Sequence, residues 1–227
     1  MPTTIRFLGH SCIEIKTGEY NLLIDPFLTG NPMAPCSAEE MNPDFILVSH
    51  GHSDHLGDAV EISKRCDATI ITNYEIHEWL AAKGVKSHGM QPGGGFNFPF
   101  GRVKLTLAFH GSSLPDGSYG STPVGFLITT KDGHTIYDAA DTSLFGDMSL
   151  IGKEGIELAF LPIGDNYTMG PDDALKAVQR IHPKKVVPIH YNTFDLINQD
   201  ADLWAEHVKK ATDSEAIVMK PGDKIDL

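Results

Sequence analysis

Residues 50–55, HGHSDH, place three histidines and an aspartate within six positions, one residue after the apolar run FILV at 45–48. A short apolar run bounded by Pro43 on one side and polar residues on the other is typical of a buried strand. Because unpaired polar side chains are costly to bury, the end of this strand is expected at an edge of its sheet. The sequence therefore predicts a sheet edge that carries a cluster of imidazole and carboxylate groups.

The spacing within this segment predicts two directions for its side chains. His50 and His52 are separated by one residue in extended chain, so both can point to the same side. Asp54 and His55 follow in a tight turn, before a helix that we expect to begin near Gly57, and must face elsewhere. Imidazole and carboxylate groups are ligands of zinc and related divalent ions. The segment can therefore serve two adjacent metal ions rather than one.

Three residues elsewhere in the chain occupy comparable places. His110 follows RVKLTLAF, Asp141 follows TIYDAA and His190 follows KKVVPI, and each of these runs is typical of a strand. Because residues at strand ends collect at one edge of a sheet, we expect these side chains to converge on the histidine segment. Asp141 would then lie between the two halves of the chain, where a carboxylate can bridge two cations.

The order of the expected elements indicates two mixed sheets. Three short runs within residues 3–25 are typical of an antiparallel meander, and strands alternate with helices from there to residue 84. A second set of strands follows a turn-rich link at 91–101. Strand and helix alternate again towards the C-terminus, where Pro171 opens a helix at its first position. Two halves of this kind favour an α+β fold with two mixed β-sheets face to face and helices on the outside.

Composition and charge narrow the class of protein. With 227 residues, 41% of them hydrophobic, the chain can form a single domain over residues 1–227 with a sizeable core. Its formal net charge of −12 argues against nucleic-acid binding, which draws on a basic surface. No apolar run reaches the roughly 18 residues of a membrane span, and the N-terminus lacks the pattern of a secretory signal. Three cysteines without metal-ligand spacing favour a reducing compartment, so we expect a cytoplasmic protein.

The HGHSDH segment matches the H-x-H-x-D-H signature of the metallo-β-lactamase superfamily, and the whole chain resembles that superfamily. The segments GHSCIEI, IDPFLTGNP, AADT and PIHYNTF are most similar to a branch of prokaryotic metal-dependent hydrolases. That branch is related to L-ascorbate 6-phosphate lactonase and, more distantly, to N-acyl-phosphatidylethanolamine phospholipase D. The resemblance implies a metallo-β-lactamase-type αββα sandwich with the active site at one edge.

The resemblance also implies a ligand set for each of two metal ions. Three histidines would hold the first ion, a mixed set would hold the second, and one carboxylate would bridge both: His50, His52 and His110; Asp54, His55 and His190; Asp141. Asp54 and Asp141 would also act in catalysis, Asp54 by orienting the attacking hydroxide.

Four further residues are candidates for supporting roles. Asp25 ends an apolar run and resembles an aspartate that supports a ligand histidine through a hydrogen bond. His10 would do the same or contact substrate. Tyr191 and Asn192 follow the last ligand histidine directly and are candidates for substrate contact.

These residues favour a hydrolase whose cofactors are two divalent metal ions, with zinc first and manganese, nickel or iron able to use the same ligands. A hydroxide that bridges the ions would attack a small-molecule ester, lactone, amide or phosphodiester, because a bound zinc lowers the pKa of water to about 7. Specificity would come from the loops at 26–43 and 112–123. The resemblance also implies a homo-oligomer.

Other classes stay open beside the hydrolase. Diiron oxidoreductases of the superfamily carry a glutamate where His52 stands, so the histidine favours hydrolysis over a diiron redox protein. A non-catalytic metal-binding module is another alternative, although a complete ligand set is hard to explain without chemistry. Nucleases of the superfamily usually carry a large insertion or an RNA-binding arm. Only 48 residues separate Asp141 from His190, which together with the acidic charge argues against a nuclease.

Overall fold

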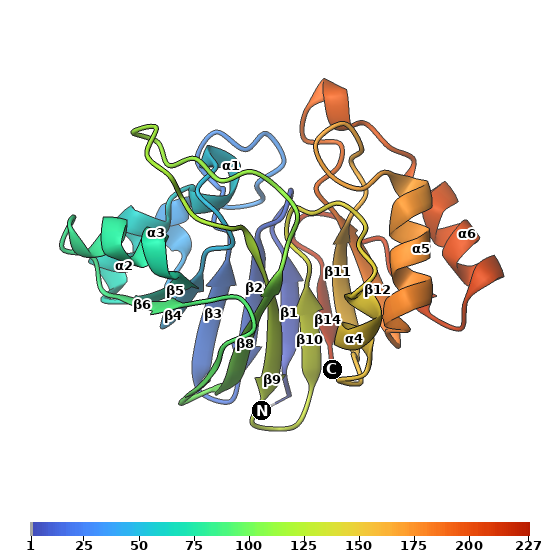
Figure 1. Cartoon of the computed structure of the whole chain (residues 1–227), viewed down its shortest axis with the longest axis horizontal. Coiled ribbons are helices and arrows are strands. Elements are labelled where there is room, and N and C mark those ends of the chain that lie inside the picture. The colour runs from blue at the N-terminus through green and yellow to red at the C-terminus, as the bar shows by residue number, and fades with distance from the viewer. Residues whose placement is uncertain (1) are drawn as a thin grey trace.

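Two β-sheets packed face to face form the centre of the molecule (Figure 1). This computed structural model describes residues 2–227, and within that range each sheet has seven strands. The first sheet has the spatial order β14 (Lys224–Asp226), β1 (Thr4–Phe7), β2 (Ile13–Thr17), β3 (Tyr20–Ile24), β4 (Phe45–Leu47), β5 (Thr69–Asn73) and β6 (Ser87–Met90). The second has the order β13 (Glu215–Ala216), β12 (Lys185–Ile189), β11 (Leu158–Pro162), β10 (Thr135–Asp138), β9 (Val124–Thr130), β8 (Gly101–Leu107) and β7 (Gly95–Phe98).

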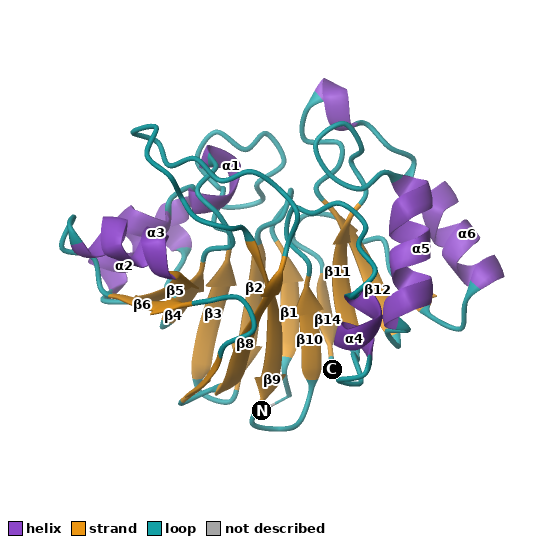
Figure 2. Ribbon diagram, in the orientation of Figure 1, coloured by secondary structure: helices purple, strands orange, loops and turns teal. Residues whose placement is uncertain are grey.

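Helices cover the outer faces of both sheets, as Figure 2 shows. Beside the first sheet lie α1 (Ser53–Leu56), α2 (Ala59–Cys66) and α3 (Tyr74–Ala81); beside the second lie α4 (Met148–Gly152), α5 (Pro171–Ile181) and α6 (Ala201–Ala211). Two short 3₁₀ helices, η1 (Ala38–Glu40) and η2 (Asp195–Ile197), interrupt the longer loops. The αββα sandwich expected from the sequence is confirmed.

Strand pairing explains why both sheets are mixed. β1, β2 and β3 pair antiparallel, with Ile5 opposite Ile15 and Ile13 opposite Ile24, as the meander predicts. β4 and β5 then add in parallel, because a long loop connects β3 to β4 and helices connect β4 to β5. The second sheet repeats this plan, since β8, β9 and β10 pair antiparallel whereas β11 and β12 add in parallel.

The main hydrophobic core lies between the two sheets. Alternate residues of each strand point into this layer, including Ile13 and Ile15 from the first sheet and Phe126 and Ile128 from the second. Two further cores lie beneath the helices, one on the outer face of each sheet. Every sheet face that carries helices is therefore packed against an apolar helix surface.

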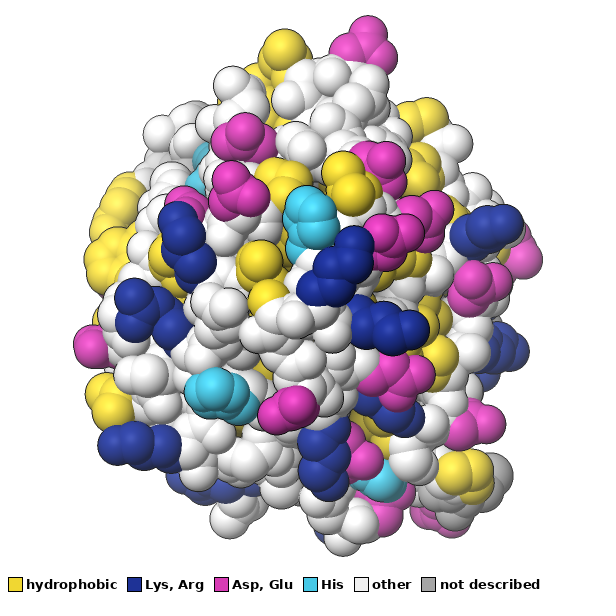
Figure 3. Space-filling view, turned by 90° about the vertical axis from the view of Figure 1, so that its right-hand side faces the viewer, with side chains coloured by type: hydrophobic (Ala, Val, Ile, Leu, Met, Phe, Trp, Pro, Cys, Tyr) yellow, Lys and Arg dark blue, Asp and Glu magenta, His cyan; other side chains and the backbone are white. Residues whose placement is uncertain are grey.

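The helix α5 illustrates how local sequence determines where a helix begins, which face it buries and where it ends. Pro171 occupies its first turn, where the missing amide hydrogen costs nothing. Ala174, Val178 and Ile181 form a buried stripe at helical spacing, and the helix ends at His182 in the left-handed conformation. Figure 3 shows this side of the molecule, where basic and acidic side chains are interspersed on the surface.

Four elements differ from the sequence-based expectation. The helix expected near Gly57 is α2, which begins at Ala59, but the motif itself forms an additional short helix, α1. The link at 91–101 contains β7, whose phenylalanines gain partners only when the strand pairs with β8. Neither α4 nor β6 was expected, since each is short and lacks a clear period.

The fold brings four strand ends to one edge of the sandwich. The segments that follow β4, β8, β10 and β12 all lie at the upper edge in Figure 1. These are the segments that carry the histidines and aspartates singled out above. In residues 2–227, none of the helices combines the length and the apolar character that a membrane crossing requires.

Candidate metal centre

The first part of the site is built by extended chain after β4. His50 is fully buried, and its Nε2 lies 3.0 Å from Nδ1 of His52. The two rings meet edge to face, with centroids 4.6 Å apart. Both side chains therefore point to the same side of the chain, as the alternation of an extended segment predicts. His110, which follows β8, completes this side, with its ring centroid 5.1 Å from each of the other two.

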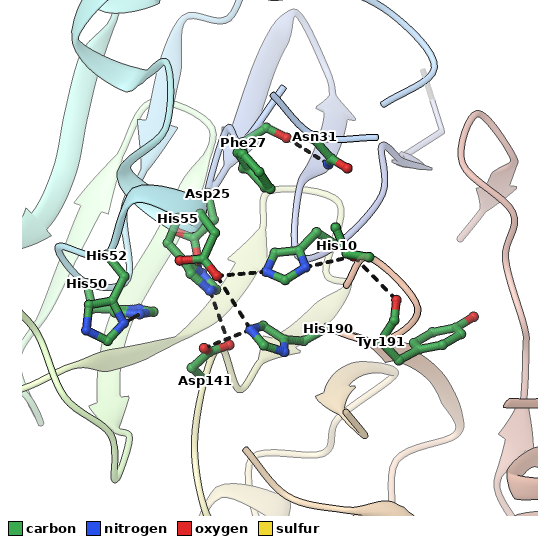
Figure 4. A network of polar contacts seen from close by, with 12 residues as sticks. His10, Asp25, Phe27, Asn31, His50, His52, His55, Asp141, His190 and Tyr191 are labelled. Carbon is green, nitrogen blue, oxygen red and sulfur yellow. Dashed lines mark hydrogen bonds and ion pairs between the residues drawn. The ribbon is translucent and has the colours of Figure 1, made fainter. Parts of the chain in front are cut away.

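The helix α1 turns the next two residues of the motif in other directions. Successive residues of a helix are rotated by about 100°, so Asp54 and His55 cannot share a face. Asp54 lies at the surface of the cavity, whereas His55 is fully buried. Figure 4 shows His50 and His52 on one side of this group and His190 and His10 on the other.

Asp141 lies between these two sides. Its Oδ1 is 3.3 Å from Nε2 of His55, and its Oδ2 is 3.0 Å from Nε2 of His190 and 3.4 Å from Nε2 of His110. The carboxylate is 2% exposed. One aspartate therefore contacts histidines that come from both sheets of the sandwich.

His10 joins the group from the loop before β2. Its Nε2 lies 3.2 Å from Oδ2 of Asp54, and its Nδ1 lies 2.9 Å from Oγ1 of Thr193. The backbone of His10 has a positive φ of 58°, which a non-glycine residue adopts only when its surroundings hold it there. Burial lowers the pKa of His10 to about 4, so its ring is neutral near pH 7.

Asp25, at the end of β3, supports two of the imidazoles. Its Oδ2 accepts hydrogen bonds from Nδ1 of His55 at 2.7 Å and from Oγ of Ser49 at 2.6 Å. Since the Ser49 hydroxyl hydrogen is used on Asp25, His50 donates its Nδ1 hydrogen to Ser49 at 2.9 Å. In the neutral form of each ring, this arrangement leaves Nε2 unprotonated and available to a cation.

Burial and neighbouring charges shift the pKa values of the cluster residues in different directions. Burial lowers the pKa of His50 and of His110. Burial alone would lower the pKa of His55 too, but the carboxylates of Asp141 and Asp25 hold it well above its usual value. The pKa of Asp141 is held well below its usual value, because the nearby His190 and His55 outweigh the effect of burial. Without cations, the site therefore holds ionised carboxylates among crowded imidazoles.

The residues present fit metal ions. Ligand atoms within 4.8 Å of one another form three overlapping groups: His50, His52 and His110; His50, His55 and Asp141; His10, Asp54, His55 and His190. In the described part of the chain, Nε2 of His55 and Oδ1 of Asp141 are buried without a hydrogen-bond partner. Buried polar atoms are rarely left unpaired, and a shared cation would satisfy both.

The structure brings nine of the eleven predicted site residues together and places two elsewhere. The side chain of Tyr191 points away from the cluster into the core beneath the helices (Figure 4). Asn192 is exposed, and its Oδ1 accepts a hydrogen bond from the amide of Gln199. Both line a separate surface hollow instead of the cavity above the cluster.

Sequence reasoning missed two hydroxyl groups that orient the imidazoles, those of Ser49 and Thr193. Each lies within three residues of a candidate ligand histidine. Proximity to a candidate ligand histidine was the sequence signal that could have identified these two residues. It is weak on its own, because serine and threonine are common at strand ends.

A cavity of about 790 Å³ opens above the cluster. Both loops expected to set specificity contribute to it, through Phe27 from one and Leu114 from the other. Tyr167 and Phe194 come from two segments that were not expected to take part. Both follow strands of the second sheet, β11 and β12, at the same edge of the sandwich.

Comparison with known proteins identifies the class. A family model described as the beta-lactamase superfamily domain matches residues 20–191, and this range holds all seven candidate ligands. The chain belongs to this superfamily.

Individual relatives define a narrower group within this superfamily. The chain is 48% identical over 231 residues to a UPF0173 metal-dependent hydrolase of Heliobacterium modesticaldum, covering 98% of this chain and 97% of the relative. It is 50% identical over 227 residues to one of Symbiobacterium thermophilum, covering 98% and 99%. The solved structure of Igni18, a metallo hydrolase from Ignicoccus hospitalis, superposes with a TM-score of 0.92 at 33% identity, covering 100% of this chain and 99% of that one. This protein is a metal-dependent hydrolase of the metallo-β-lactamase superfamily.

Proposed function

We propose that this protein uses two divalent metal ions, zinc first, to hydrolyse a small-molecule ester, lactone, amide or phosphodiester. The observation that carries the proposal is the placement of Asp141. This buried carboxylate contacts His55, His110 and His190 at 3.0 to 3.4 Å and leaves Oδ1 without a hydrogen-bond partner in residues 2–227. A bridging role between two cations accounts for both features.

The ligand groups divide around this carboxylate. His50, His52 and His110 would hold one ion, and Asp54, His55 and His190 would hold the other. His10 lies in the second group as well, but its Nε2 faces Asp54 and its Nδ1 is used on Thr193. We assign His10 to holding Asp54 in place, which keeps that carboxylate aimed into the cavity.

Ions bound at such a site supply Lewis acidity and acidify water near neutral pH. Asp54 lines the cavity, and its pKa stays well below the usual range because the hydrogen bond from His10 and the charge of His55 outweigh burial. It can therefore accept a hydrogen bond from the attacking water and orient it. In the reaction, the water oxygen bonds to the carbonyl carbon or phosphorus, the bond to the leaving group breaks, and the water proton passes to the leaving group.

The test combines metal content with turnover. Purified protein is loaded with zinc, its metal content is measured by mass spectrometry, and it is assayed on chromogenic esters, lactones, amides and phosphodiesters. H52A is expected to lose most bound metal and at least about a hundredfold in kcat/KM. H207A removes an exposed histidine of α6 and is the matched control.

Two outcomes would reject the proposal. One is full activity in H52A with unchanged metal content. The other is two bound ions per chain without turnover of any substrate class, which would favour a non-catalytic metal-binding module. Activity in H207A equal to that of the parent protein shows that any loss in H52A is specific to the site.

A further inference from the structure

The charged residues that line the cavity all belong to the metal cluster. Among the described residues around it, the imidazole and carboxylate groups are those of His52, Asp54, His110, Asp141 and His190. No lysine, arginine or glutamate from residues 2–227 reaches this surface. The remainder of the lining is apolar or carries only a hydroxyl group. Beyond the cluster, a charged substituent on a substrate would therefore meet no ionic partner.

One wall of the cavity is aromatic and rests on the second ligand group. Phe194 packs against His10 and Phe27, with ring centroids 5.6 and 6.3 Å away. Phe194 is 42% exposed, Tyr167 is 54% exposed and Leu196 is 66% exposed. Contiguous exposed apolar side chains in a concave site mark a place where a ligand covers them. This wall thus offers apolar surface that only a bound molecule would remove from water.

The opposite wall is held in place before any ligand binds. Leu114 and Pro115 line the cavity from the loop after β8. The amide of Leu114 donates to the carbonyl of Ser118 at 3.0 Å. Trp79 donates from Nε1 to Asp116 at 2.6 Å, which ties the tip of the loop to α3. A wall fixed in this way loses little conformational freedom when it contacts a substrate.

Charge and shape together select a substrate class. Transfer of an anionic group to a low-dielectric wall without a partner is costly, and the chain itself carries a net charge of −12. Burial of an apolar group against the two walls is favourable, because it removes apolar surface of both partners from water. We propose that the cavity accepts carboxylic esters or lactones that carry an uncharged alkyl or aryl group, and discriminates against those that carry a charged substituent beyond the scissile bond. This inference rests on the hydrolytic function proposed above.

The first test varies the substrate on the zinc-loaded protein. From 4-nitrophenyl acetate to 4-nitrophenyl hexanoate, kcat/KM is expected to rise at least about tenfold, because four more CH₂ groups are buried. The mono-4-nitrophenyl ester of adipic acid, which ends in a carboxylate, is expected to fall at least about tenfold below hexanoate. A flat chain-length series, or equal kcat/KM for the adipate and hexanoate esters, overturns the inference while leaving the hydrolytic function standing.

The second test changes the wall. L196K adds a cation beside the cavity, and L203K adds one at an exposed leucine of α6 as the matched control. L196K is expected to lower kcat/KM for the hexanoate ester and to raise it for the adipate ester, so that their ratio shifts at least about tenfold. L203K is expected to leave the ratio unchanged. Equal ratios in both variants overturn the inference.

A binding measurement separates this inference from the proposed catalysis. N-hexylacetamide and an uncharged analogue of equal length with ether and hydroxyl groups in its chain are titrated against the zinc-loaded protein by NMR. The hexyl compound is expected to bind at least about tenfold more tightly, and L196K is expected to weaken it. Such a preference without turnover of any of the four substrate classes rejects the proposed hydrolytic function and supports the apolar site. Equal affinities reject the apolar site whatever the turnover.

Discussion

At the scale of single residues, one carboxylate controls the protonation of two imidazoles. Asp25 accepts from His55 directly and from His50 through the hydroxyl of Ser49. Each hydrogen bond places the ring hydrogen on Nδ1 and frees Nε2 for a cation. Because both rings depend on this chain of hydrogen bonds, the hydroxyl of Ser49 matters as much as its position beside the cluster.

S49A is therefore expected to weaken zinc binding about ten- to a hundredfold, since His50 loses the acceptor that fixes its tautomer. A competition titration with a chromophoric chelator measures the affinity. S63A is the control, because that buried hydroxyl donates to the carbonyl of Ala68 at 2.7 Å, away from the cluster. Removal of the Ser63 hydroxyl is expected to cost about 1 kcal/mol of stability and no zinc affinity. Equal zinc affinities in S49A and S63A would contradict the assignment.

Asp138 is a buried acid without a full set of partners. Its Oδ1 accepts from the amide of Ala140 at 3.0 Å, while Oδ2 has no hydrogen-bond partner in the described chain. Burial, with the charge of Asp25 second, raises the pKa of Asp138 from 3.8 to about 8. The folded protein thus keeps a proton on Asp138 that the unfolded chain releases above pH 4.

This difference in pKa between the folded and unfolded states predicts that the stability of the metal-free protein depends on pH. Between about pH 4 and pH 8 the folded state binds more protons, so the free energy of unfolding falls as the pH rises, and the loss levels off above pH 8. D138N keeps the oxygen acceptor and removes the titration. Its stability relative to the parent is expected to rise by a few kcal/mol from pH 5 to pH 8. Urea unfolding in the presence of a chelator measures it, and a constant difference across this range would disprove it.

At the scale of elements, the short helix α1 is what separates the two ligand groups. It ends at Gly57, where φ is +42° and a Cβ would overlap the carbonyl oxygen of Pro26. Only glycine fits that backbone conformation and that contact together. The direction in which Asp54 and His55 leave the strand therefore depends on this glycine.

G57A is expected to lower the free energy of unfolding by more than 2 kcal/mol and to weaken zinc binding, because backbone strain and overlap both act at the end of α1. G84A is a matched control, since Gly84 has a φ of +69° but no atom within 4 Å of its would-be Cβ. It is expected to cost about 1 kcal/mol, through backbone conformation alone. Urea unfolding and chelator competition measure the two effects, and equal losses in both variants would contradict the role of the overlap.

Elements with strong local signals could be predicted from the sequence, and those that depend on partners could not. The meander of β1 to β3 and the apolar stripe of α5 follow from period and turn residues alone. The strand β7 forms because the rings of Phe98 and Phe100 stack at 5.5 Å and β8 supplies hydrogen bonds. Neither contact is visible in a stretch rich in glycine and proline.

The residues of the site likewise divide into those that could be predicted from the sequence and those that could not. Seven candidate ligands were predictable because histidine and aspartate at strand ends form a specific pattern. The aromatic wall was not, because Tyr167 and Phe194 are ordinary loop residues until the fold places them beside the cluster. Tyr191 was expected near the substrate from its neighbour His190, yet the positive φ of His190, 54°, turns the chain so that the two side chains diverge.

At the scale of the molecule, the site exists only where the two sheets meet. The segment after β4 supplies four of the seven candidate ligands, and the ends of β8, β10 and β12 supply the other three. One core fills the space between the sheets, and the last strand, β14, returns to pair with β1. We propose that residues 1–227 form a single domain, because neither sheet can bury its inner face without the other.

The two tryptophans allow this proposal to be tested, since Trp79 lies in α3 beside the first sheet and Trp204 lies in α6 beside the second. In W79F and W204F the remaining tryptophan reports on one side of the sandwich. Because both sides share the inner core, the fluorescence midpoint in urea is expected to coincide with that of far-ultraviolet circular dichroism in each variant. Zinc is expected to raise both midpoints of a variant together, since its ligands come from both sheets. Two separated transitions, or a zinc effect confined to one tryptophan, would show that the halves unfold independently.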